Sequence, residues 1–446
     1  MDADIRPENA GAKVRVFQNR NFALLFWGIF VSNIAHVFFN FAIGFYIYEV
    51  TIPLVGAADA EILKAVYIAL AGILLVILSP IGGVLADRWN KARIMVVTDF
   101  VRGITILVSG AVVFLVDSNL VKLVVLFAME VVLASNAAIF GPASGSLLRF
   151  IVSDEELQPG ASYLQMSNSF QSIIGLVFAA ALYSRLGIGW IFVMNGVAYV
   201  LSAVSEMFIR YEHHRAETDA ITMRDVVRDI GAGIRYIASE KAIVAILVMA
   251  LMINFFISPI FSNGMQNFVY FRFAQESGYL LSNVWDPTTW FGAFSIALSI
   301  ASIAMSFILS RKPTRQSYAK PLKTAFMGFV VAMSGICATI ALYYYDVVPI
   351  DFVLVAVLIL MFVSGLGLVA FNVPLGLVMQ RKVRKDMLGK VSAVTSTLSQ
   401  ALIPIASLLA GFVIARAGNQ VFFIAAALGM IAVSAWFLPN KASNQI

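Results

Sequence analysis

The stretch GGVLADRWNKAR, residues 82–93, places Asp87, Arg88, Lys91 and Arg93 between two long apolar runs. A charged side chain at the centre of a bilayer costs at least about 2.5–3.5 kcal/mol. We therefore expect this stretch to lie at a water boundary, as a short turn between two membrane spans. The rest of the chain is interpreted outward from that turn.

The composition excludes an ordinary soluble protein. Of the 446 residues, 60% are hydrophobic and 13% are charged, whereas a soluble domain averages about 45–50% apolar and about 25% charged residues. Apolar runs long enough to cross about 30 Å of hydrocarbon recur along the whole chain. The first such run follows 21 polar residues and is too long for a signal peptide, so we expect it to remain as a span.

The hydropathy pattern predicts an all-α membrane protein with twelve transmembrane helices in two pseudo-symmetric bundles of six. The expected domains are residues 1–210, a cytoplasmic linker at 211–241, and residues 242–446. Similar charged, Ser-rich segments follow spans four and ten, as in transporters built from repeats. The expected spans are 22–50, 61–86, 94–116, 122–146, 166–184, 188–210, 242–268, 286–309, 323–345, 352–378, 391–416 and 418–438.

The basic residues predict the orientation. Of the 31 Lys and Arg, 25 lie in the two tails and in alternate loops, four lie in the intervening loops, and Lys64 and Arg102 lie inside spans. Because cytoplasmic loops carry the excess of Lys and Arg, both termini are expected in the cytoplasm of a multi-pass protein of the inner (cytoplasmic) membrane. The net charge of +6 then reflects the orientation of the chain in the membrane and does not indicate nucleic-acid binding.

The linker contains the segment TMRDVVRDIGAGIRYI, residues 222–237. Its apolar side chains recur at helical spacing, which predicts an amphipathic helix on the cytoplasmic membrane surface. A plain solvated linker helix is the alternative.

GVLADRWNKAR (83–93) resembles the loop signature of the major facilitator superfamily, Gly-x-Leu-Ala-Asp-Arg-x-Gly-Arg-Arg/Lys, with Asn90 in place of the second Gly. TDFVRG (98–103), FGPA (140–143), EEL (155–157), Gln380 and DMLGKV (386–391) are similar to its drug-efflux branch of macrolide efflux proteins and the enterobactin exporter. The Gly-Pro-rich antiport signature of span five is absent, with GLVFAA (175–180) in its position.

The resemblance implies a conformational latch between the two halves on the cytoplasmic side. Gly83 would let helices two and eleven approach, and Asp87 would face the N-terminus of helix eleven near Val391. Asp99 and Arg102, spaced i and i+3, can pair, and Arg88 or Arg93 could reach Asp99. The alternative is that these charges only follow the positive-inside rule. The latch residues are Gly83, Asp87, Arg88, Lys91, Arg93, Asp99 and Arg102.

Polar side chains within spans predict a substrate and proton cavity. His36 and Glu130 lie at similar depths in spans one and four, which makes them a candidate titrating pair. The alternative is a His36 satisfied by Asn33 or Asn40. The other expected cavity residues are Asn136, Asn168, Gln171, Asn254 and Gln266.

No phosphate loop or nucleotide-binding domain is present, and three histidines do not build a zinc site alone. We therefore expect that the protein is not an enzyme and uses no metal or cofactor. We expect a monomeric secondary transporter that works by alternating access. It would export amphipathic or lipophilic molecules, coupled to protons. Its partners are the substrate, protons and membrane lipids. A lipid or lysophospholipid flippase on the same fold is the alternative; a channel or receptor without turnover is disfavoured by the two-half repeat.

The orientation can be tested with topology reporters. A reporter fused after Arg215 is expected to be active only in the cytoplasm, and one fused at Ser277 only outside, because Lys and Arg concentrate in the loops on the Arg215 side. Alkaline phosphatase and green fluorescent protein fusions measure the two sides. The reverse pattern would contradict the predicted orientation.

Overall fold

The computed structural model describes residues 16–210, 223–310, 319–383, 391, 394–395 and 401–439. The elements up to residue 210 are a short 3-10 helix and four long helices. They are η1 (Val16–Gln18), α1 (Arg20–Arg88), α2 (Lys91–Leu115), α3 (Asn119–Ile151) and α4 (Asp154–Met207).

The elements after residue 222 begin with the linker helix α5. They are α5 (Met223–Ser239), α6 (Lys241–Pro259), η2 (Ile260–Met265), η3 (Phe268–Arg272), η4 (Phe273–Gln275), α7 (Pro287–Ser310), α8 (Ala319–Tyr344), α9 (Ile350–Lys382), α11 (Ile403–Ala417) and α12 (Asn419–Phe437).

The expected all-helical membrane fold is confirmed. Among the described residues, nine helices are long and apolar enough to span a membrane. The first of them, Arg20–Gly83, contains two of the predicted spans, because α1 turns back at the single residue Gly56 (φ 80°, ψ 169°). Gly187 (φ 73°, ψ 170°) turns α4 in the same way. Glycine tolerates these positive φ angles without steric cost, so a helical hairpin needs no separate loop at either position.

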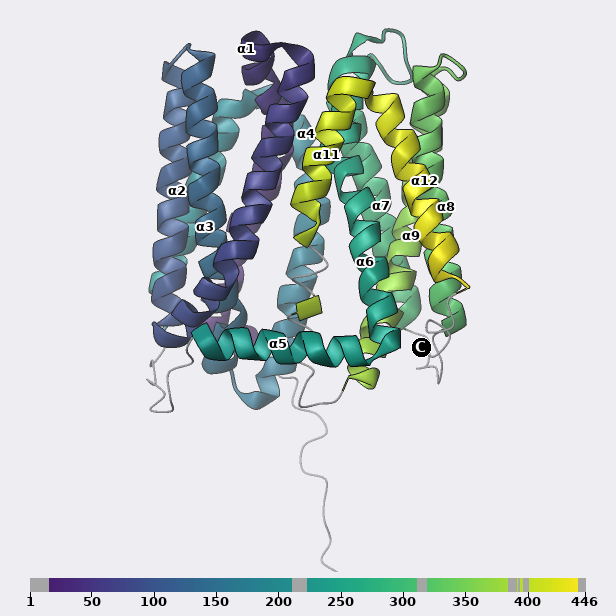
Figure 1. Cartoon of the computed structure of the whole chain (residues 1–446). Coiled ribbons are helices and arrows are strands. Elements are labelled where there is room, and N and C mark those ends of the chain that lie inside the picture. Colours follow the sequence, from purple (N-terminus) through teal and green to yellow (C-terminus); the bar gives the residue numbers. More distant parts are fainter. Residues whose placement is uncertain are drawn as a thin grey trace, which may run out of the picture.

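The spans pack side by side in two groups, α1–α4 and α6–α12 (Figure 1). Helix α5 lies across one end of both groups, nearly perpendicular to the spans (Figure 1). The expected linker helix is therefore present, and its buried Ile237 packs against Ile243 and Leu247 of α6. We call this the linker end and the other the opposite end. The placement of α5 on a membrane surface stays a prediction.

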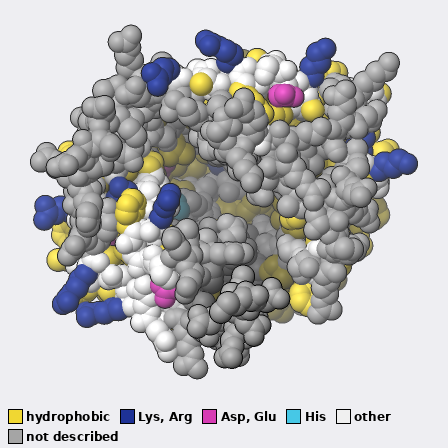
Figure 2. All heavy atoms as spheres, turned by 90° about the horizontal axis from the view of Figure 1, so that it is seen from below, with side chains coloured by type: hydrophobic (Ala, Val, Ile, Leu, Met, Phe, Trp, Pro, Cys, Tyr) yellow, Lys and Arg dark blue, Asp and Glu magenta, His cyan; other side chains and the backbone are white. Residues whose placement is uncertain are grey.

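The closest contacts between the two groups lie away from the linker end. A Cβ atom at Gly411 of α11 would lie only 2.3 Å from the Cβ of Ala65 in α1, and one at Gly72 would lie 2.5 Å from Cγ of Pro404. By contrast, among the described residues no atom beyond the adjacent residues and helix backbone of Gly83 lies within 4 Å of its Cβ position, near the linker end. Seen from the linker end, the molecule is hollowed between its two sides (Figure 2). This conformation is thus closed at the opposite end and open at the linker end.

The glycine contacts predict that one of two matched substitutions separates the helix groups and that the other does not. Gly411→Val should hold the opposite end apart, because the added side chain meets Ala65. Gly83→Val should leave this conformation intact, because the described residues place no neighbouring side chain within 4 Å of an added Cβ atom. Spin labels at Ala58→Cys and Ala417→Cys, both exposed at the opposite end, report the separation, and Cys337 is buried and out of reach of the label. A lengthened distance is expected for Gly411→Val alone; equal distances in both variants would contradict the assignment.

Candidate functional site: the central cavity

A cavity of about 540 Å³ lies between the spans, lined mainly by α1 and α3, with single residues from α2, α4 and η2 and with Gln266 beside them. Its apolar wall includes Ile43, Ile47, Ile68, Leu75, Leu133 and Phe140. Its polar and ionisable lining consists of Asn33, His36, Asn40, Lys64, Tyr67, Arg102, Glu130, Tyr199, Ser262 and Gln266. A largely apolar wall with few charged groups suits a molecule that has an apolar body and a polar end.

The structure brings several of the predicted cavity residues together and leaves others apart. Asn33, His36, Asn40, Glu130 and Gln266 line the cavity. The amide of Asn136 donates to the carbonyl of Val132 on its own helix at 2.8 Å, and Gln171 donates to Ser167 at 2.7 Å. Neither of them lines this cavity, and nor does Asn254. The side chain of Asn168 lies outside the described residues.

His36 and Glu130 share the cavity but have separate partners. The His36 ring lies 3.0 Å from the Asn40 amide, measured from Nε2 to Nδ2, and packs edge-on against the Tyr199 ring. Glu130 accepts a hydrogen bond of 2.7 Å from the Tyr67 hydroxyl. In this conformation His36 therefore has the Asn40 contact given above as the alternative. A proton shared between His36 and Glu130 stays a prediction.

The cavity contains a charged residue that the sequence reasoning did not use. Lys64 lies in α1, is 1% exposed, and lines the cavity. Glu61, one turn earlier on the same helix, is also 1% exposed. The signal that could have found them is the segment AEILKAV (60–66), where two opposite charges at i and i+3 interrupt an apolar span.

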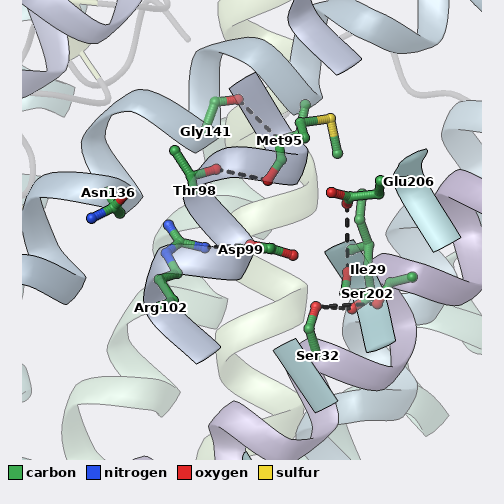
Figure 3. Close-up of polar contacts among 12 residues, drawn as sticks. Ile29, Ser32, Met95, Thr98, Asp99, Arg102, Asn136, Gly141, Ser202 and Glu206 are labelled. Atoms are coloured by element: carbon green, nitrogen blue, oxygen red, sulfur yellow. Dashed lines mark hydrogen bonds and ion pairs between the residues drawn. The ribbon is translucent and has the colours of Figure 1, made fainter. Parts of the chain in front are cut away.

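Asp99 and Arg102 form a buried ion pair beside the cavity (Figure 3). The guanidinium Nη1 lies 3.2 Å from Oδ1 of Asp99, and the two residues are 6% and 0% exposed. Arg102 also lies over the rings of Phe140 and Tyr199, which favours a desolvated cation. The predicted pairing of Asp99 with Arg102 is confirmed.

The other latch residues are partly described. Arg93 is exposed, whereas Lys91 is buried with its ammonium 4.9 Å from the Phe150 ring centre. The side chains of Asp87 and Arg88 lie outside the described residues, as does most of the segment at the start of helix eleven. Gly83 faces open space in this conformation. The latch therefore stays a prediction about the conformation in which the linker end is closed.

The side chains that the structure describes include His, Cys, Asp and Glu, the residue types that ligate metal ions. Among them, no three His, Cys, Asp or Glu residues gather closely enough to hold a metal ion.

Comparison with known proteins places the fold in a transporter family. Residues 25–407 match the sequence model of the Major Facilitator Superfamily. The uncharacterized MFS-type transporter YkuC of Bacillus subtilis is 23% identical over 390 residues, which cover 84% of this chain and 81% of that protein. Macrolide efflux protein A of Streptococcus pyogenes is 24% identical over 245 residues, covering 54% of this chain and 58% of that protein.

Two solved structures show the same arrangement of helices. The nucleoside transporter NupG superposes with a TM-score of 0.67 at 16% identity, over 94% of this chain and 98% of that chain. A bacterial homologue of the human lysosomal transporter Spinster, in an inward-facing and unoccupied conformation, gives a TM-score of 0.66 at 14% identity, over 97% of this chain and 98% of that chain.

The ion pair beside the cavity predicts a stability effect. Arg102→Met should lower the free energy of unfolding by about 3–5 kcal/mol, because it leaves the Asp99 carboxylate buried without its cation. The double variant Asp99→Asn/Arg102→Met should recover much of that loss, since no uncompensated charge remains. Thermal unfolding in detergent micelles measures both. Equal melting temperatures for the single and double variants would contradict the pairing as a source of stability.

Proposed function

Because the chain belongs to the Major Facilitator Superfamily and is a secondary transporter, not an enzyme, we propose that it exports amphipathic or lipophilic small molecules in exchange for protons. The observation that carries this proposal is the central cavity. Its wall is mainly apolar, and its ionisable groups, among them His36, Glu130 and Lys64, are few and lie among apolar neighbours. Such a site takes up the apolar body of a substrate and fixes one polar end.

The distribution of contacts supports alternating access. The two groups of helices meet away from the linker end, at Gly411 and Ala65, while the surroundings of Gly83 are open. With the linker end in the cytoplasm, as the Lys and Arg distribution predicts, the cavity receives its substrate from the cytoplasm. The buried charges of the latch would then close that side in the other half of the cycle.

Export is supported by the relatives. One relative is named as a macrolide efflux protein. Its similarity covers about half of this chain. A macrolide such as erythromycin, with a large apolar ring and an amine, is therefore the first probe to use.

A lipid or lysophospholipid flippase is the second candidate function. Lys64 and Arg102 both line the cavity, and two cations beside an apolar wall suit a lipid phosphate with its acyl chain. The absent antiport signature in span five also favours it. Substrate-stimulated proton movement in liposomes distinguishes proton-coupled drug export from lipid flipping.

Proton coupling predicts a defined defect for Glu130→Gln. The variant should lose accumulation of erythromycin against its gradient but keep downhill exchange, because the cavity wall is unchanged and only the titrating carboxyl is gone. One proton moving down about 100 mV supports an erythromycin concentration ratio of roughly fifty-fold across the membrane. In the variant this ratio should fall to about one. His36→Asn should reduce accumulation less, because Glu130 remains. Uptake into proteoliposomes with and without an imposed pH difference is the measurement.

The matched control is Glu49→Gln. Glu49 also accepts a hydrogen bond from a tyrosine, Tyr183, but it does not line the cavity. Glu49→Gln should transport like the wild type. If Glu130→Gln still concentrates erythromycin under a pH difference, Glu130 does not carry the coupling proton.

A further inference from the structure

Glu61 lies where the two groups of helices meet at the opposite end. Its carboxylate accepts hydrogen bonds from the Tyr48 hydroxyl in its own helix, from Nδ2 of Asn267 at 2.9 Å and from Nδ2 of Asn263 at 3.3 Å. The two asparagines belong to the other group of helices. Separation of the groups at this end would therefore remove two of the donors that stabilise the ionised carboxylate.

The backbone that carries these asparagines is unusual. Asn263 lies in η2, and Asn267 immediately precedes η3, and both elements are π-helical turns within one span. Such turns are frequently found at functional sites. Asn263 is further held by Ser407 of α11, whose hydroxyl donates to its Oδ1 at 2.9 Å. The span thus gives up regular helical geometry at the place where it contacts Glu61.

The hydrogen-bonded chain continues from Glu61 into the central cavity. Nζ of Lys64 donates to the Tyr48 oxygen at 2.9 Å and lies 4.3 Å from the centre of that ring. Lys64 lines the central cavity, whereas Glu61 lines a second pocket of about 290 Å³ at the opposite end. Glu61, Tyr48 and Lys64, which we call the relay, therefore join two spaces that lie on either side of the closed contact.

The other charged groups near Glu61 are already engaged. Arg416 of α11 pairs with Asp59 at 3.3 Å, and Arg272 of η3 pairs with Asp346 at 2.9 Å. The Tyr344 hydroxyl of α8 accepts a hydrogen bond from Asn419. Lys64 is then the cation that reaches Glu61 through a single intervening hydroxyl.

We propose that Glu61 is the site at which the transporter takes up its coupling proton from the opposite side, and that Tyr48 and Lys64 pass this proton to the central cavity. The proposal rests on the proton coupling of the proposed function and names the residues that perform it. It places proton entry in the relay, apart from the His36 and Glu130 region of the cavity.

Each step conserves protons and involves no change in electron count. With the opposite end open, hydronium protonates the Glu61 carboxylate. On closure, Asn263 and Asn267 return as donors, the acid proton moves to the Tyr48 oxygen, and the hydroxyl proton of Tyr48 moves to the neutral amine of Lys64. The contacts of the Tyr48 hydroxyl with Glu61 and with Nζ of Lys64 in this structure fit the carboxylate and ammonium that result. Lys64 then releases its proton through water in the cavity to Glu130, from which it leaves on the linker side, and one proton has crossed.

A measurement without substrate tests Glu61. Spin labels at Ala58→Cys and Ala417→Cys report the separation at the opposite end of the full chain in lipid nanodiscs, measured between about pH 8 and about pH 5.5. In the wild type, the long-distance population should grow as the pH falls. In Glu61→Gln this response should be lost, with the long-distance population increased at every pH, because a neutral amide mimics the protonated acid.

Glu276→Gln is the matched control, because Glu276 also accepts from a tyrosine, Tyr343, at the same end but within the second group of helices. It should keep the wild-type response. A Glu61→Gln variant with the wild-type response would overturn the proposal, as would a wild-type protein whose distances do not change with pH.

Tyr48→Phe tests the relay. It leaves the Glu61 contacts with Asn263 and Asn267 in place, so the pH response of the distance should persist. Proton release into pyranine-loaded proteoliposomes during erythromycin transport should be lost, and wild-type proton release in this variant would overturn the transfer step. A wild-type protein that moves no erythromycin would contradict the proposed function, while the distance measurement would still support or overturn Glu61 as the proton site.

Discussion

Hydrocarbon offers no hydrogen bonds, so every polar group within the bilayer must find a partner inside the chain. This constraint explains why the spans within α1 and α4 are helices, whose backbone hydrogen bonds are made within the chain, on both sides of Gly56 and Gly187. It also explains the pairing of buried charges. Asp99 is bound to Arg102, and Glu61 accepts from three side chains. The few charges within the spans therefore hold specific positions, and those positions lie around the cavity and at the contact between the helix groups.

The spans could be predicted from hydropathy because a membrane span needs an apolar length that few other structures require. The helix ends could not. The fifth span was expected at 166–184, yet α4 begins at Asp154, where Ser153 and Glu156 form a capping box. Hydropathy marks the part of a helix that lies in lipid, whereas hydrogen bonding and capping decide where it ends in water. The sequence Ser-Asp-Glu-Glu at 153–156 contained that signal.

The site was predictable in part for a similar reason. Asn33, His36 and Asn40 share one helical face, so one residue facing the cavity implied the others. The role of Glu61 depends on Asn263 and Asn267, which lie 202 and 206 residues away in sequence, and local spacing carries no information about such a contact. Gly83 illustrates a different limit. The close approach predicted for it belongs to a state with the linker end closed, and a sequence does not say which of two states a structure adopts.

The linker has a mechanical consequence for the whole molecule. Helix α5 is fastened to the second group, where Ile237 packs with Ile243 and Leu247, and residues 208–222 connect it to the end of α4. Fully extended, that connection would reach about 50 Å, much farther than the width of a pair of packed helices. A connection with that reach does not limit rocking of the two groups. Cohesion between the halves comes from side-chain packing and the surrounding lipid, so two polypeptides divided within this connection would still assemble into one transporter.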